Sequence, residues 1–505
     1  MMKLTPKQSL SEEEIKTGLK LMIGDGLAAE AMTTLTGGAF LVAMALLMGA
    51  SNFQIGLLAS LPTFTNLFQL ASIWLVRKFN NRRAVAVGCA LLARVPLIAV
   101  GILPFLVSAD HFVNALIVLL FVYYLFGSIA GPSWNSWIKD MVPEKTLGAY
   151  FSRRGSYTQT LNVVLSVVLA LLVDYVKRHY PEAEADTYAI LFIIGGTVGI
   201  MGAFILSRVQ EPQSYLKKEN ILRLIRQPLQ DRNFRKLLIF NSAWVFALNI
   251  ATPFFTVFML KSLHIQLSYI IGFTIVSQIF SIFTIRAWGM YADRYSNKTI
   301  IAIGAPLYIL CLIAWCFVGI FTHQYANLIL LVSIHIFTGI STAGINLSLT
   351  NIGLKLAPKE DAIVYLTCKN IITSIFSSLA PVLGGFLADY FTNRSLIVVA
   401  TWSSPDVNKL FRLALFHEWN FLFLIAAILA FIAVELLLQV NEVGEVHKDQ
   451  VVRIMRSNLR NNLKDHFLIG NMITWPKHVL TLIRKRTTRK RITHPHHHQP
   501  KTSLE

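Results

Sequence analysis

The second half of this chain repeats the first half at an offset of about 215 residues. Each matched position lies at the end of a long apolar segment. Repetition over such a distance indicates two structurally related halves, each built from the same set of membrane spans. The matched positions are Arg77 to Gly88 with Asp293 to Gly304, Pro143 and Tyr150 with Pro358 and Tyr365, and Asp174 and Tyr175 with Asp389 and Tyr390.

The apolar segments are long enough to cross a membrane. The chain is 54% hydrophobic and 14% charged, with a mean hydropathy of +0.55, which is too apolar for an ordinary soluble protein. A span of the ~30 Å hydrocarbon core needs about 20 mostly apolar residues, and unbroken segments predict helices rather than strands. The sequence therefore predicts an all-α polytopic membrane protein, with twelve transmembrane helices in two pseudo-symmetric six-helix bundles. The expected spans are 20–49, 53–76, 84–107, 112–138, 157–177, 188–208, 236–260, 267–291, 299–321, 327–354, 363–391 and 419–440.

Lys and Arg residues concentrate in the connections on the side of the N-terminus, and this asymmetry predicts that both termini are cytoplasmic. The net charge of +19 does not imply a nucleic-acid partner, because the basic residues flank spans instead of lining one groove. The expected location is the plasma membrane, which in a bacterium is the inner membrane. We expect a cytoplasmic N-terminus at 1–19, bundles at 20–208 and 236–440, a cytoplasmic linker at 209–235 and a basic cytoplasmic tail at 441–505.

The linker and the tail each allow two interpretations. In the linker, Leu222, Leu224 and Ile225 lie on one side of a short helix that would rest on the inner membrane surface, and a solvated tether is the alternative. In the tail, apolar residues at helical spacing and a polybasic run over 484–491 favour binding to the anionic inner leaflet, and a disordered tail is the alternative.

The loop between the eighth and ninth apolar segments carries a motif. Its sequence, Gly289-Met-Tyr-Ala-Asp293-Arg294-Tyr-Ser-Asn-Lys298, resembles the loop motif that the major facilitator superfamily of transporters carries at this place. The resemblance covers about residues 20–440. A carboxylate at a helix end accepts charge-assisted hydrogen bonds from a neighbouring helix N-terminus and from basic residues. The resemblance implies that this cluster latches the cytoplasmic side in one conformation and opens in the other.

The first-half copy of this motif departs from the family pattern. Arg77 stands where the acid is expected, and Ile73 stands where the glycine is expected. Asp140, at the end of the fourth span, could supply the missing carboxylate from a neighbouring helix. The alternative is that the basic residues of this loop only set the topology.

Two opposite charges are expected at one depth in the membrane. Glu30 and Arg94 each lie ten residues into a span that runs outward, about 15 Å deep at 1.5 Å per residue. An ion pair would offset much of the cost of burying them. It is either a structural bridge or a functional site, in which Arg94 tunes Glu30 for proton or substrate binding.

Other polar residues in the spans are weaker candidates. Asp25 lies nearer the cytoplasmic end of the first span, and His335 lies near the middle of the tenth, where its pKa could suit proton coupling. The resemblance implies that spans one, four, seven and ten line a central cavity. Candidate substrate-cavity residues are Tyr123, Tyr124, Asn241, Asn249, Gln278 and Asn346.

These features predict a secondary active transporter that moves a small solute by alternating access, with proton coupling. A polytopic membrane enzyme, such as an acyl or glycosyl transferase, is the alternative of another class, and an uncoupled facilitator is the third. No nucleotide cradle, zinc spacing or nucleophile elbow occurs in the sequence, so we expect no cofactor and no catalytic or metal site. The expected partners are a small-molecule substrate and membrane lipid, with the chain as a monomer.

Overall fold

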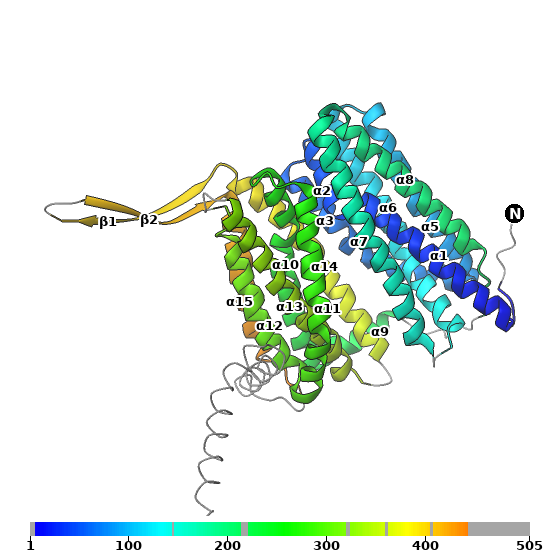
Figure 1. Cartoon of the computed structure of the whole chain (residues 1–505). Coiled ribbons are helices and arrows are strands. Elements are labelled where there is room, and N and C mark those ends of the chain that lie inside the picture. The colour runs from blue at the N-terminus through cyan, green and yellow to red at the C-terminus, as the bar shows by residue number, and fades with distance from the viewer. Residues whose placement is uncertain are drawn as a thin grey trace, which may run out of the picture. The chain divides into compact units, whose positions relative to one another are not determined.

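The structure, a computed structural model, describes residues 6–143, 146–213, 221–319, 324–358, 362–404 and 408–442 (Figure 1). Long helices make up both halves of the described chain. The first half contains α1 (Glu12–Thr36), α2 (Gly38–Leu47), α3 (Asn52–Thr65), η1 (Asn66–Phe68), α4 (Gln69–Phe79), α5 (Arg82–Leu106), α6 (Ala109–Met141), α7 (Leu147–His179), η3 (Pro181–Ala183) and α8 (Glu184–Ser207). The second half contains α10 (Arg232–Lys261), α11 (Leu267–Tyr295), α12 (Asn297–Trp315), α13 (Gln324–Leu356), α14 (Ala362–Phe391) and α15 (Glu418–Leu437).

Eleven helices in the described residues are long and apolar enough to cross a membrane, so the chain is an integral membrane protein. The expected span at 53–76 is not among them because it is broken into α3, η1 and α4, each shorter than a full crossing. Pro62 lies inside α3, where it removes a backbone donor. Together the three pieces still supply the twelfth element of the predicted fold.

The first span begins earlier than predicted and is divided in two. Ser11 and Glu14 form a capping box that starts α1 at Glu12, eight residues before the expected start at 20. The helix ends at Gly37, and Gly38 has φ +57°, which a residue with a Cβ rarely adopts. The apolar run therefore continues as a separate short helix, α2.

The connection after α14 departs from the all-helical prediction. Between α14 and α15, β1 (Ser395–Ser403) and β2 (Asn408–His417) pair as an antiparallel hairpin. Ser395 pairs with His417, and the register shifts between Val398 and Val399.

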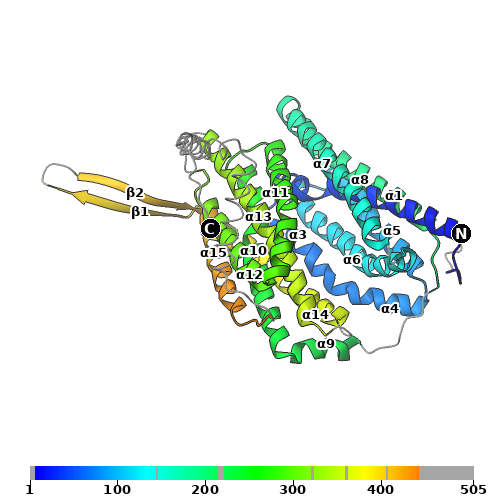
Figure 2. The ribbon, with the colours of Figure 1, turned by 60° about the horizontal axis from the view of Figure 1, so that its bottom comes forward.

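The linker contains a helix, α9 (Ile221–Gln230), which packs against α10 and α14 (Figure 2). A short helix therefore forms in this segment, and its placement on the inner membrane surface stays a prediction. The predictions for the tail concern residues that, from 443 onward, lie outside the described part of the chain.

Successive spans alternate in direction, so the helix ends gather on two faces. We call the face on which α1 begins the proximal face and the opposite face the distal face. The starts of α5, α7, α12 and α14 lie on the proximal face, and the starts of α3, α8, α11 and α15 lie on the distal face.

Candidate functional site

A buried ion pair joins α1 and α5. Arg94 Nη2 donates to Asp25 Oδ1 at 3.2 Å, and Arg94 Nη1 donates to the carbonyl of Gly199 in α8 at 2.5 Å. Both charged side chains are buried. Glycines in α8 make room for them, because a Cβ at Gly202 would lie 3.2 Å from Asp25 Oδ1 and from Arg94 Nη1.

This pair replaces the predicted one between Glu30 and Arg94, which the structure contradicts. Five residues along an α-helix correspond to a rotation of about 140°, so Asp25 and Glu30 point to different sides of α1. Glu30 is half-buried, and its carboxylate makes no hydrogen bond or ion pair within the described residues. The depth estimate placed Glu30 correctly in a span but could not show which side of the helix faced α5.

A cavity of about 420 Å³ opens beside the ion pair. Asp25 and Arg94 line it, and so do Tyr123 and Tyr124 of α6, whose ring centroids lie 4.7 Å apart. The two tyrosines were predicted as cavity residues, and the structure places them there. Other polar lining residues are Asn66, Gln69, Ser128, Trp134, Asn135 and Arg154.

Arg154 is not among the cavity residues expected from the sequence. The span was expected to begin at 157, but α7 begins at Leu147, which places Arg154 two turns inside the helix. Its guanidinium lies 4.8 Å from the ring centre of Trp134. Its Nε is buried and has no hydrogen-bond partner among the described atoms. An Arg shortly before an apolar run is a signal that could have suggested a second cation in the cavity.

A second cavity, of about 540 Å³, lies between the two halves. Tyr124 and Pro62 line both cavities. Asn162 of α7 donates to Thr34 Oγ1 of α1 at 3.0 Å on its wall. The second half contributes hydroxyl groups to the same cavity, from Thr252, Thr256 and Thr274.

The remaining span candidates lie elsewhere. His335 Nδ1 donates to the Leu331 carbonyl at 2.8 Å, and its ring contacts those of Phe273 and Trp315. Asn249 donates to Ser377 Oγ at 3.3 Å. Asn241 is buried, whereas Gln278 and Asn346 are exposed, and none of these five candidate residues lines the two cavities just described.

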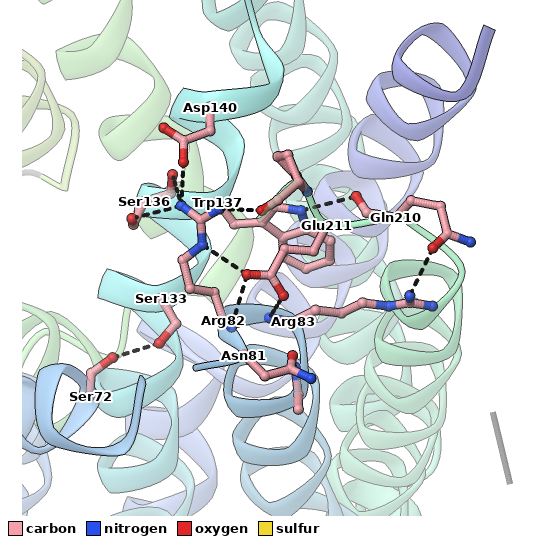
Figure 3. A network of polar contacts seen from close by, with 12 residues as sticks. Ser72, Asn81, Arg82, Arg83, Ser133, Ser136, Trp137, Asp140, Gln210 and Glu211 are labelled. Carbon is pink, nitrogen blue, oxygen red and sulfur yellow. Dashed lines mark hydrogen bonds and ion pairs between the residues drawn. The ribbon is translucent and has the colours of Figure 1, made fainter. Parts of the chain in front are cut away.

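A carboxylate caps the start of α5 on the proximal face (Figure 3). Glu211, just after α8, accepts the backbone N–H groups of Arg82 and Arg83 at 3.0 and 2.9 Å, and Arg82 Nε at 2.9 Å. Asp140, at the end of α6, pairs with Arg82 Nη1 at 2.5 Å. The sequence suggested a role for Asp140 in this loop but did not identify Glu211.

The second half repeats this cap. Glu442, after α15, accepts the backbone N–H groups of Asn297 and Lys298 at 3.2 and 2.7 Å, and Lys355 Nζ at 3.2 Å. Burial opposes ionisation of Glu442, but these hydrogen bonds and that from the Asn297 amide outweigh it, so the pKa of the carboxyl lies below its usual value. We call Glu211 and Glu442 the proximal caps. Each ties the end of a sixth span to the start of the third span of its own half.

The loop-motif residues lie next to the second proximal cap. Gly289, Asp293 and Arg294 are in the last turns of α11; the side chains of Asp293 and Arg294 are exposed, and Asp293 forms no hydrogen bond or ion pair in the described chain. Lys298, by contrast, is buried, and its Nζ donates to the Leu438 carbonyl.

The first-half copy of the loop has no acid at the matching position. Because α5 and α12 begin 215 residues apart, at Arg82 and Asn297, the position that matches Asp293 is Lys78, one residue after the expected Arg77. Arg77 is exposed.

A second set of carboxylates joins the two halves on the distal face. Asp174, near the end of α7, accepts the backbone N–H groups of Leu267 and Ser268 at the start of α11, at 3.0 and 2.8 Å. Asp389, near the end of α14, accepts those of Asn52 and Phe53 at the start of α3, at 3.1 and 2.8 Å. We call Asp174 and Asp389 the distal caps. Close packing accompanies them, because a Cβ at Gly385 would lie 2.5 Å from the Asn52 carbonyl oxygen.

Comparison with known proteins gives a family and a fold. A family model described as Major Facilitator Superfamily matches residues 26–364, and no curated protein matches. The D-xylose-proton symporter aligns at 14% identity and a TM-score of 0.60, over 86% of this chain and 100% of its own. The nucleoside transporter NupG aligns at 14% identity and a TM-score of 0.60, over 84% and 98%. A bacterial homologue of the human lysosomal transporter Spinster aligns at 15% identity and a TM-score of 0.54, over 76% and 84%. Identities this low establish the fold alone.

Proposed function

The chain belongs to the Major Facilitator Superfamily, as the motif around Asp293 predicted, and we propose that it is a secondary active transporter of a small solute. Its family makes it a membrane transporter. The finer proposal is that the two bundles, 20–208 and 236–440, rock about the cavities between and within them. We also propose that the proximal face is cytoplasmic, because the basic connections lie there.

The contacts of the distal caps are the main support for the proposal of alternating access. Each one joins the C-terminal end of a helix in one bundle to the first turn of a helix in the other bundle. Outward opening of the distal side must separate these groups. The structure is therefore proposed to be the inward-facing state, closed at the distal face.

The pair α7 and α11 carries a carboxylate at each end. Asp174, on α7, caps the start of α11, while Asp293, on α11, is exposed near the proximal face. We propose that Asp293 caps the start of α7 when the proximal side closes. Such contacts, each made in one state only, set the populations of the two states.

Asp25 is the proposed coupling residue, in preference to Glu30. It is the only carboxylate among the described lining residues of the 420 Å³ cavity, and its partner is Arg94. Protonation of Asp25 would release Arg94 from the ion pair, so proton binding and the electrostatics of the cavity are linked. Glu30 remains the second candidate, since its half-buried carboxylate is unpaired within the described residues.

Proton-driven uptake into liposomes tests this function. The purified chain is screened for solutes that raise its thermal stability, and uptake of those solutes is measured with and without a proton gradient. We expect accumulation in wild type, none with Asp25→Asn, and exchange that persists in that variant. Accumulation that survives both Asp25→Asn and Glu30→Gln would place coupling elsewhere. Flux without accumulation under any gradient would identify a uniporter.

A further inference from the structure

We propose that the substrate carries an anionic group, a carboxylate or a phosphate, and that Arg154 binds this group in the 420 Å³ cavity. This inference rests on the proposed transport function and names the class of substrate.

The charges that line the cavity do not balance. Its described lining residues include two guanidinium groups, of Arg94 and Arg154, and one carboxylate, of Asp25. Asp25 Oδ1 is engaged by Arg94 at 3.2 Å. The second cation has no carboxylate within ion-pair distance in the described chain. One carboxylate is thus shared between two cations, and the described lining carries an excess of positive charge. Because excess charge inside a membrane protein is unfavourable, an anionic ligand that enters the cavity would gain a favourable electrostatic interaction.

Arg154 is held in place without an ion pair within the described residues, although the Asp25 carboxylate lies near enough to interact with it electrostatically. Its guanidinium lies over the Trp134 ring, 4.8 Å from the ring centre, which is within cation–π distance. Gly26 of α1 permits the close approach, because a Cβ there would lie 2.7 Å from Arg154 Nε and Nη2. Trp134 and Arg154 both line the cavity. A planar guanidinium that is already positioned suits bidentate binding of a carboxylate or phosphate.

The rest of the cavity suits the remainder of a small organic molecule. Asn66, Gln69 and Asn135 offer amide groups, and Tyr123 and Tyr124 offer hydroxyl groups and ring faces. A volume of about 420 Å³ lies in the range usual for small-molecule sites. The cavity thus combines one cationic anchor with several neutral donors and acceptors, as expected for a metabolite with one anionic end.

Matched compounds test the ligand class on the full-length protein in detergent. Thermal unfolding is followed with glucose 6-phosphate against glucose, with succinate against succinamide, and with inorganic phosphate alone. We expect a saturable rise in unfolding temperature with an anionic member of a pair and none with its neutral counterpart. The two pairs distinguish a phosphate from a carboxylate ligand. A response to the neutral compounds equal to that of the anions, or no response to any anion at millimolar concentration, overturns the proposal.

Variants at two adjacent arginines test the residue. Arg154→Gln should weaken binding of the responding anion about tenfold or more, the loss expected for a hydrogen bond to a charged group, and Arg154→Lys should weaken it less. Arg153→Gln is the control, because Arg153 is exposed and its Nε donates to Tyr157 at 3.1 Å. Equal affinity in Arg154→Gln and wild type contradicts the assignment.

A measurement on the ligand-free protein tests the proposal even if the natural ligand is not among the compounds screened. If Arg154 is an unsatisfied cation, Arg154→Met should leave the unfolding temperature of the empty protein unchanged or raise it. A marked fall would mean that the guanidinium is satisfied by the protein itself, against the proposal. Transport is measured separately from binding. Accumulation of a neutral solute by Arg154→Gln would support the transport function and contradict the anion site. Binding of an anion without any flux would support the anion site and contradict the transport function.

Discussion

Asp174 and Asp389 lie 215 residues apart and make the same contact, each from its own bundle to the other. The oxygens of each carboxylate accept two successive backbone N–H groups in the first turn of the facing helix, at 2.8 to 3.1 Å. The positive end of that helix adds a favourable charge–dipole interaction. The repeat in the sequence is thus also a repeat of the contact that joins the two bundles on the distal face.

Neutralising the distal caps should open the distal side. The double variant Asp174→Asn, Asp389→Asn keeps one acceptor oxygen at each site but removes the negative charge. The lost charge–dipole interaction should weaken the contact between the bundles by about 0.5–2 kcal/mol per site. We expect the outward-facing population to rise by about 2- to 30-fold per site. Labelling of Thr256→Cys, in the cavity between the bundles, by an impermeant thiol reagent from the distal side measures this. Asp186→Asn, which changes an exposed acid on the distal face, is the control. Unchanged labelling in the double variant would contradict a role of the distal caps in holding the distal side closed.

Asp293→Asn should act in the opposite direction. Since Asp293 is exposed and unpaired within the described residues, its loss should leave the unfolding temperature of the structure shown here unchanged. The proximal-closed state should lose a contact, so transport should fall several-fold and distal labelling of Thr256→Cys should decrease. If Asp293→Asn transports at the wild-type rate when it is expressed at the normal level, the proposed role of Asp293 in closing the proximal side is wrong.

Asp25 and Arg94 should be energetically coupled. Removing one partner leaves the other as a buried unpaired charge, so a double-mutant cycle of Asp25→Asn and Arg94→Gln should give a coupling energy of about 1 kcal/mol or more. The same cycle with Glu30→Gln should be additive within about 0.5 kcal/mol. Unfolding in detergent gives both values. The reverse result would restore the pair predicted from the sequence.

Glu442 should make stability depend on pH. Its pKa is lowered in the native state, so its contribution is present above its unfolded pKa of about 4.3 and is lost as pH falls through the lower native pKa. Glu442→Gln should flatten this acidic part of the stability profile, while Glu182→Gln, an exposed distal acid, should not. Glu442→Ala should cost about 1–3 kcal/mol at neutral pH, because first-turn N–H groups of α12 lose their acceptor. An identical acid profile in wild type and Glu442→Gln would contradict the assignment.

The fold could be predicted from the sequence because hydrophobic length and repetition are global signals. Boundaries were less accurate, since polar caps decide them. Ser11 extends α1 by two turns, and α7 begins ten residues before its apolar run at 157. The break in the second span at η1 required the local backbone, which composition does not reveal.

The candidate site was predictable only in part. Tyr123 and Tyr124 line a cavity, as the resemblance implied for their span, while their contact with substrate stays a prediction. The prediction that Glu30 pairs with Arg94 was wrong, because the depth of a residue along a helix does not show which side of the helix it lies on. Glu211 and Glu442 follow the last residues of their spans, where a lone acid looks like ordinary linker sequence until the facing helix start is known.

The break between α1 and α2 divides the first span into a part that contacts the other bundle and a part that forms the buried ion pair. α2 contacts α10 and α11 of the other bundle, whereas Asp25 pairs with Arg94 inside its own bundle, thirteen residues before the turn at Gly38. A continuous helix would transmit any tilt of its distal tip to the charged pair. In the proposed rocking motion, the glycine joint would let α2 move with the opposite bundle while the Asp25–Arg94 pair keeps its position in its own bundle.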